Sequence, residues 1–196
     1  MRPYVESDPV APLSAYGRSK ADAERMVGAA YPGALIARTS AFFGPWDRAN
    51  VVHLAAAAFA AGQPWRAPHD QRVSPTYVPD LVNVSLDLLI DGAAGIWHLA
   101  NEGSVSWAEL AGKVAAILGY PAALVDECPS AALALAAARP SSSVLGTERG
   151  QRMPPLDDAL ARFVTEAGGA DGCDNEPVYA EAHARHVRGP YRDTAA

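Results

Sequence analysis

The sequence has few cysteines, little excess charge and no long apolar run, and each shortage excludes a class of protein. Cys128 and Cys173 are the only cysteines and stand 45 positions apart, which is neither a disulfide framework nor a zinc-ligand spacing. The apolar stretches stop near ten residues, well short of the roughly 20 that cross a bilayer. We therefore expect two reduced thiols, no metal site and no membrane partner.

Charge and the N-terminal residues narrow the partners further. Sixteen Lys and Arg against 22 Asp and Glu give a net charge of −6, so no basic excess points to nucleic acid. The first residues contain no apolar signal segment. We expect a cytoplasmic protein whose partner is a small molecule or another protein.

What is present indicates an α/β fold. Hydrophobic residues make up 49% of the chain and charged residues 19%, as in soluble globular domains. Sixteen glycines and sixteen prolines divide the first 165 residues into short β-rich runs and longer helical patterns. The predicted helices span residues 14–30, 51–61, 80–90, 106–118 and 156–166, and the predicted strands span 34–38, 72–73, 95–99 and 123–126.

The pattern ends near residue 167. From residue 168 the chain continues as a glycine-containing, mixed-charge segment without periodicity. We therefore expect one domain over 1–167 and a disordered tail over 168–196. His183 and His186 lie in that tail, where solvated side chains are a simpler interpretation than a metal site.

The most informative feature is the pair Tyr16 and Lys20, four residues apart within the first predicted helix. This spacing places the phenol and the ammonium on one helix face. A nearby cation favours the ionised form of a phenol, which lets a tyrosine act as a general acid or base. The alternative is a half-buried tyrosine beside a solvated charge. With seven tyrosines and two lysines in the chain, chance gives only about 0.07 such pairs, so the pattern favours chemistry.

These residues lie in a segment that resembles the dTDP-4-dehydrorhamnose reductases, a group of extended short-chain dehydrogenases. Five segments resemble the family and follow its order along the chain. The resemblance as a whole extends over about residues 4–166. The segments are Ser7–Lys20, Arg38–Ser40, Pro75–Asp80, Gly95–Trp107 and Arg139–Leu145, the last with Ser142 where the family usually has asparagine.

The resemblance implies a fold and an activity. The fold is the C-terminal part of a Rossmann-like doubly wound sheet plus a small α/β substrate-binding lobe. The activity is reduction of the 4-keto group of dTDP-4-dehydro-6-deoxy-L-mannose to dTDP-L-rhamnose by NADPH or NADH. In this scheme Tyr16 donates the proton, Lys20 assists Tyr16 and holds the nicotinamide ribose, and Ser40 lies on the cofactor side. A homodimer is compatible with the resemblance.

One expected motif has no counterpart in this sequence. The family binds the cofactor pyrophosphate at a glycine-rich turn between a first strand and a helix, whereas Gly92 and Gly95 lie between a helix and a strand. We therefore expect cofactor binding only together with an N-terminal half, as an upstream domain. The alternative is a non-catalytic nucleotide-sugar-binding module, or a tail of a larger fused protein. A glycine-rich strand–turn–helix upstream of Met1 would favour the reductase.

The sugar pocket departs from the family at Ala41, where the resemblance leads one to expect tryptophan. Phe42, Phe43 or Trp46 could replace the missing ring, or all three could fill the core. We favour Trp46, because Gly44 and Pro45 form a turn that could direct its indole over the strand end; otherwise the pocket is wider and accepts a bulkier sugar. The remaining substrate candidates are Asn50, Thr76 and Arg139.

Overall fold

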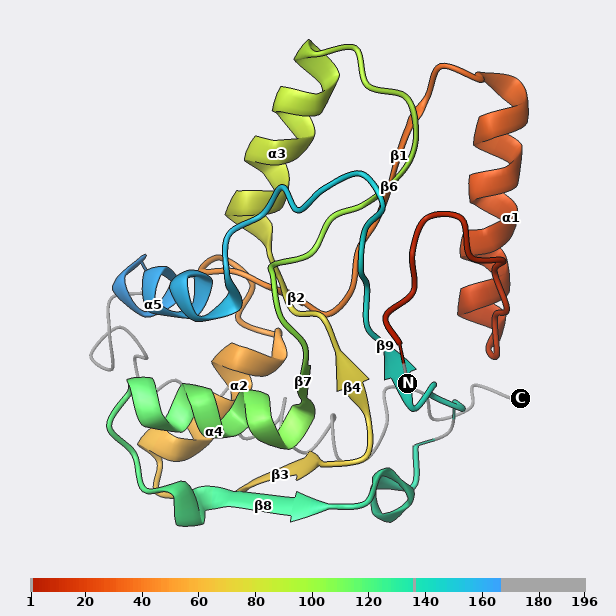
Figure 1. The fold of residues 1–196 in the computed structure, drawn as a ribbon. Coiled ribbons are helices and arrows are strands. Elements are labelled where there is room, and N and C mark those ends of the chain that lie inside the picture. The colour runs from red at the N-terminus through yellow and green to blue at the C-terminus, as the bar shows by residue number, and fades with distance from the viewer. Residues whose placement is uncertain (1, 136, 167–196) are drawn as a thin grey trace, which may run out of the picture.

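The computed structural model describes residues 2–135 and 137–166, which form an α/β fold with two parts (Figure 1). In one part, β1 (Leu35–Arg38) and β6 (Gly95–His98) form a parallel pair. The helices α1 (Ala15–Ala30) and α3 (Val78–Ile90) lie on opposite sides of this pair. The arrangement confirms the predicted α/β class.

The second part is a lobe of short strands and three helices. Its strand pairs join segments that are distant in sequence, a topology typical of slower folding. The helices are α2 (Val51–Ala60), α4 (Trp107–Ile117) and α5 (Leu156–Glu166); β2 (Phe42–Phe43) pairs with β5 (Thr76–Tyr77), β3 (Trp65–Pro68) pairs with β8 (Val125–Cys128), and β4 (Arg72–Val73) lies between β7 (Val105–Ser106) and β9 (Ser142–Ser143).

The hydrophobic core is concentrated in this lobe. Its largest fully buried side chains, Tyr77, Phe43 and Phe59, pack with apolar residues of α2, α4 and α5. A smaller cluster beneath α3 contains Trp97 and Leu99. Neither cluster includes a residue of α1, and no residue of this helix is fully buried. The lobe is therefore a packed scaffold, whereas α1 depends on a few polar contacts.

Most predicted elements are confirmed, and the differences have local causes. The strand expected at 123–126 begins at Val125, because a 3₁₀ turn over Ala122–Leu124 comes first. The helix expected to start at Asp80 starts at Val78. Asp80 is buried inside its first turn and is bound by both guanidinium nitrogens of Arg162, at 2.6 and 2.7 Å. An ion pair with α5, not capping, explains this aspartate.

An ion pair attaches α1 to the sheet. Arg38, at the end of β1, donates to both carboxylate oxygens of Glu24 on α1, at 2.6 and 2.8 Å. Its guanidinium also lies 3.3 Å from Nε2 of His98 on β6. His98 is buried, and its Nδ1 lies 2.8 Å from the carbonyl of Gly146. Both ring nitrogens of this buried histidine therefore have partners, and the ring helps to support the arginine.

A second carboxylate, Glu6, joins three segments. It accepts hydrogen bonds from the backbone N–H of His98, the hydroxyl of Thr147 and the backbone N–H of Glu148, at 2.7–3.0 Å. Burial alone would raise the pKa of Glu6, but these hydrogen bonds outweigh it and lower the pKa to about 2. The N-terminal segment is therefore fixed beside β6 by a charged acceptor.

We expect Glu24→Gln to loosen α1 without unfolding the lobe. The change removes the charge-assisted pair with Arg38, and the loss of about 1 kcal/mol should speed amide exchange in α1 roughly five- to tenfold. Hydrogen–deuterium exchange followed by mass spectrometry measures this. Asp22→Asn is the matched control, because Asp22 and Arg25 form an exposed pair on the same helix. Equal exchange in both variants would contradict the assigned role of Arg38.

The pKa of Glu6 predicts an acid-sensitive contribution to stability. Because the folded pKa is about 2 and the ordinary value is 4.5, the contribution is complete above about pH 4.5 and is lost as the pH falls toward 2. Glu6→Gln should lower the free energy of unfolding by about 1–3 kcal/mol at neutral pH. It should also flatten the pH dependence in that window, as measured by urea unfolding. Glu127→Gln, at an exposed glutamate, serves as the control. If the free energy of unfolding of Glu6→Gln had the same pH dependence as that of the wild type, the assignment would be contradicted.

Candidate functional site

The candidate residues gather at the end of the sheet where β1 finishes. The chain turns sharply between α1 and β1, so the helix runs back along the strand and its first turn lies at the end where β1 ends (Figure 1). Tyr16 is in this first turn, and Ser40 and Ala41 follow β1. Ligands of open α/β sheets bind outside the carboxyl ends of parallel strands. The fold thus places both groups at the edge where such a ligand would lie.

Tyr16 and Lys20 lie together, as the spacing predicts. The Lys20 ammonium is 5.5 Å from the centroid of the Tyr16 ring, and Tyr16 is 72% exposed. Ser14 caps the helix by accepting a hydrogen bond from the backbone N–H of Gly17. A Cβ on Gly17 would come within 3.0 Å of Pro12, so this glycine permits the close approach of the incoming chain. The result is an accessible phenol with a cation beside it.

Ser40, Ala41 and Thr76 form a second group. Ser40 Oγ lies 3.3 Å from Ser143 Oγ, and its backbone N–H donates to the Thr76 hydroxyl at 3.4 Å. Thr76 is fully buried, so its hydroxyl serves the backbone of this turn. Ala41 has a φ of +33°, a conformation that non-glycine residues avoid. Its carbonyl accepts from the backbone N–H of Thr76 at 3.0 Å, which helps to hold this strained turn.

The aromatic residues after Ala41 separate into core and surface. Phe43 is 1% exposed and packs in the core, whereas Phe42 is 52% exposed and Trp46 is 77% exposed. The alternative in which all three rings fill the core is therefore wrong. β2 pairs with β5, which turns one ring of the Phe42–Phe43 pair inward and the other outward. The Trp46 indole is left accessible to a ligand.

Asn50 supports the turn that carries Trp46. Its Oδ1 accepts from the backbone N–H groups of Val52 and His53 and caps α2, and its Nδ2 donates to the carbonyls of Gly44 and Asp47. Every hydrogen-bonding group of this amide is thus engaged within the chain. Arg139 is exposed in the segment ahead of β9.

Sequence reasoning missed two residues that shape this region. The sequence shows Arg38 only as part of a motif, whereas in the structure it binds the helix that carries Tyr16. His53 has no motif around it, yet it is 6% exposed and its Nε2 lies 3.2 Å from the carbonyl of Pro45. A lone histidine in the alanine-rich segment 51–61 was the available signal for the second.

In the part of the chain that it describes, the structure supports neither a metal site nor a membrane-spanning helix. Within residues 2–135 and 137–166, no three His, Cys, Asp or Glu side chains gather as a metal site. None of the helices described is long and apolar enough to span a membrane. The predicted tail 168–196, with Cys173 and its histidines, lies outside the described residues.

Comparisons with known proteins agree on one family. The family model described as RmlD substrate binding domain matches residues 1–167. A probable dTDP-4,6-dihydroxy-2-methyloxan-3-one 4-ketoreductase of Streptomyces antibioticus is 37% identical over 80% of this chain and 54% of the relative. The dTDP-4-dehydrorhamnose reductase of Mycolicibacterium smegmatis is 33% identical over 80% of this chain and 49% of its own length. The chain spans about half the length of these relatives.

Solved structures give the same result. The crystal structure of dTDP-4-dehydrorhamnose reductase from Bacillus anthracis in complex with NADP has a TM-score of 0.78 and 30% identity, over 84% of this chain and 59% of that one. A dTDP-glucose 4,6-dehydratase from the same organism has a TM-score of 0.71 at 16% identity, over 85% and 56% of the two chains, which shows likeness of fold alone. The expected fold class, part of a Rossmann-like sheet with a substrate lobe, is confirmed. The chain belongs to the RmlD substrate binding domain family.

Proposed function

We propose that this chain is the proton-donating and sugar-binding part of an NAD(P)H-dependent reductase. The reaction is reduction of the 4-keto group of a dTDP-linked 4-keto-6-deoxysugar, with dTDP-4-dehydro-6-deoxy-L-mannose as the specific substrate. The observation that carries the proposal is the Tyr16 ring beneath the Lys20 ammonium, 5.5 Å away, at the edge where β1 ends. The family relationship supports the same reaction class.

The exposed donors of α1 fit a nicotinamide ribose. Within the described residues, no carboxylate pairs with the Lys20 ammonium, which leaves its N–H groups available to ribose hydroxyls. Ser40 adds a hydroxyl at the end of β1, held near Ser143. When bound, NAD(P)H supplies the hydride. A complete cofactor site requires further residues, because a pyrophosphate needs a cradle of backbone amides. The side chains of Tyr16, Lys20 and Ser40 do not provide one.

The protein's own chemistry is a proton transfer at Tyr16. As the carbonyl carbon of the sugar is reduced, its oxygen becomes an alkoxide and takes the proton of the Tyr16 hydroxyl. The phenolate that remains is stabilised by the nearby Lys20 ammonium. Because Tyr16 is 72% exposed, substrate and the rest of the enzyme have to cover it to exclude water.

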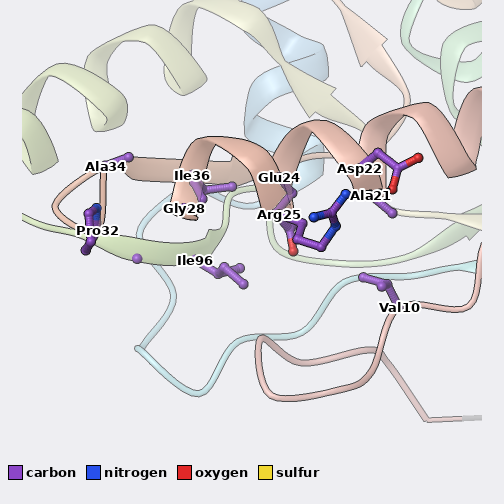
Figure 2. Close-up of a pocket in the computed structure, with 11 residues that line it drawn as sticks. Val10, Ala21, Asp22, Glu24, Arg25, Gly28, Pro32, Ala34, Ile36 and Ile96 are labelled. Carbon is purple, nitrogen blue, oxygen red and sulfur yellow. Dashed lines mark ion pairs between the residues drawn. The ribbon is translucent and has the colours of Figure 1, made fainter. Parts of the chain in front are cut away.

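The surface along α1 is where we place the rest of the reductase. Met26 and Val27 on this helix and Tyr31 directly after it are 47–67% exposed. In the described part of the chain β1 pairs only with β6, so its other edge has unpaired backbone groups. A groove of about 510 Å³ runs between α1, Ile36 of β1 and Ile96 of β6 (Figure 2). A nucleotide-binding half that extends the sheet past β1 would bury these surfaces.

Tyr16→Phe tests the proton donor in a protein that joins this chain to the N-terminal half of a homologous reductase. The ring stays and the hydroxyl is lost, so turnover should fall roughly 10²–10⁴-fold in an assay of NADPH oxidation with dTDP-4-dehydro-6-deoxy-L-mannose. Lys20→Ala should also weaken cofactor binding. Tyr4→Phe is the matched control, because Tyr4 is another exposed tyrosine, at 46%, and lies outside α1.

The outcomes separate the alternatives. Near-normal turnover of Tyr16→Phe would show that Tyr16 is not the proton donor. If the joined protein binds the nucleotide sugar but never oxidises NADPH, the chain is the non-catalytic binding module instead.

A further inference from the structure

A buried histidine supports the most exposed tryptophan of the described residues. Trp46 is 77% exposed and lies in the turn between β2 and α2. His53, in the first turns of α2, is 6% exposed, and its Nε2 lies 3.2 Å from the carbonyl of Pro45, the residue before Trp46. The imidazole of His53, which holds this turn, is therefore buried, whereas the indole of Trp46, which the turn carries, is exposed.

The hydrogen bond fixes the tautomer of His53. A carbonyl can only accept, so Nε2 carries the proton. Nδ1 is then a lone pair, and it is buried with no hydrogen-bond partner among the described residues. Burial lowers the pKa of His53, against the opposing effect of the Pro45 carbonyl. This position therefore favours a neutral imidazole that forms one hydrogen bond, through Nε2.

The ring is also fixed by packing. Its centroid lies 4.9 Å from that of Phe163 on α5, in an edge-to-face arrangement. Phe163 is itself buried and contacts Phe43. The His53 ring is thus fixed by the core of the lobe, and its hydrogen bond in turn fixes the Pro45 carbonyl. Asn50 holds the carbonyls of Gly44 and Asp47 on either side, so three carbonyls of the turn are bound from the start of α2.

We infer that His53 is a positioning residue for the sugar site, which holds the Pro45 carbonyl so that Trp46 presents its ring face to the sugar. The inference rests on the proposed function, since it takes a nucleotide-linked sugar as the ligand. An exposed indole offers an apolar face on which the C–H groups of a sugar ring can lie. A side chain contributes more to affinity when it and its backbone do not have to be ordered on binding. The turn, pinned before the ligand arrives, meets this condition.

The first test uses the full chain and needs no activity. ¹⁵N NMR of the histidine rings should find Nε2 of His53 protonated and Nδ1 unprotonated. His53→Phe keeps the ring and its packing but removes the donor, so the backbone and indole ¹H–¹⁵N signals of Trp46 should show increased motion in heteronuclear NOE measurements. His53→Gln, which keeps a donor, should restore the rigid signals, and His69→Gln is the matched control at an exposed histidine. An Nδ1-protonated tautomer, or unchanged Trp46 dynamics in His53→Phe, would overturn the inference.

The second test reads the sugar directly, in the joined protein described above. His53→Phe should raise KM for the nucleotide sugar about tenfold, the equivalent of about 1.4 kcal/mol, while kcat stays within about twofold. The double variant with Trp46→Ala should match Trp46→Ala alone, because His53 acts through that ring. An unchanged KM, or fully additive effects, would overturn the role in sugar binding. If the unsubstituted joined protein never oxidises NADPH, the proposed function fails, whereas the NMR result still decides whether His53 holds Trp46.

Discussion

The ion pair between Glu24 and Arg38 is the constraint on which the candidate site depends. The helix α1 carries Tyr16 and Lys20 but contributes no residue to either buried cluster, so apolar packing holds it less firmly than the helices of the lobe. Arg38 reaches from the end of β1 to both oxygens of Glu24 and is itself supported by His98. The pKa of Glu24 is lowered, chiefly by its hydrogen bonds from Arg38. The placement of the phenol relative to the strand end thus rests on a charge-assisted contact.

The lobe, in contrast to α1, is held together mainly by apolar packing. The lobe packs α2, α4 and α5 around buried aromatic residues, and its turns are held by hydrogen bonds from buried side chains such as Asn50 and His53. A rigid lobe suits recognition of a sugar, because preorganised contacts lose little entropy on binding. A lightly attached helix suits a site that is completed by a second body of protein. The two parts therefore divide the work of the proposed reaction.

The sequence predicts the long elements and one half of the site, and the reasons for the rest are physical. The helix over Ala15–Ala30 has a clear serine cap, and the four-residue spacing of Tyr16 and Lys20 defines their contact. The two-residue strands, such as β2, β5 and β9, have no periodicity long enough to detect; they exist because distant segments pair. The partners of Asp80 and Arg38 could not be predicted for the same reason, since each ion pair joins separate elements of the fold.

The measurement that bears most directly on the account is a calorimetric titration of NADPH into this chain alone and into the chain joined to a nucleotide-binding half. The account predicts no saturable binding by the chain alone, because in the proposed site Tyr16, Lys20 and Ser40 contact only the ribose end of the cofactor and form no cradle for the pyrophosphate. The joined protein should bind with a dissociation constant on the order of micromolar, worth about 8 kcal/mol. Binding of similar strength by the chain alone would contradict the central claim that it holds only one part of the site.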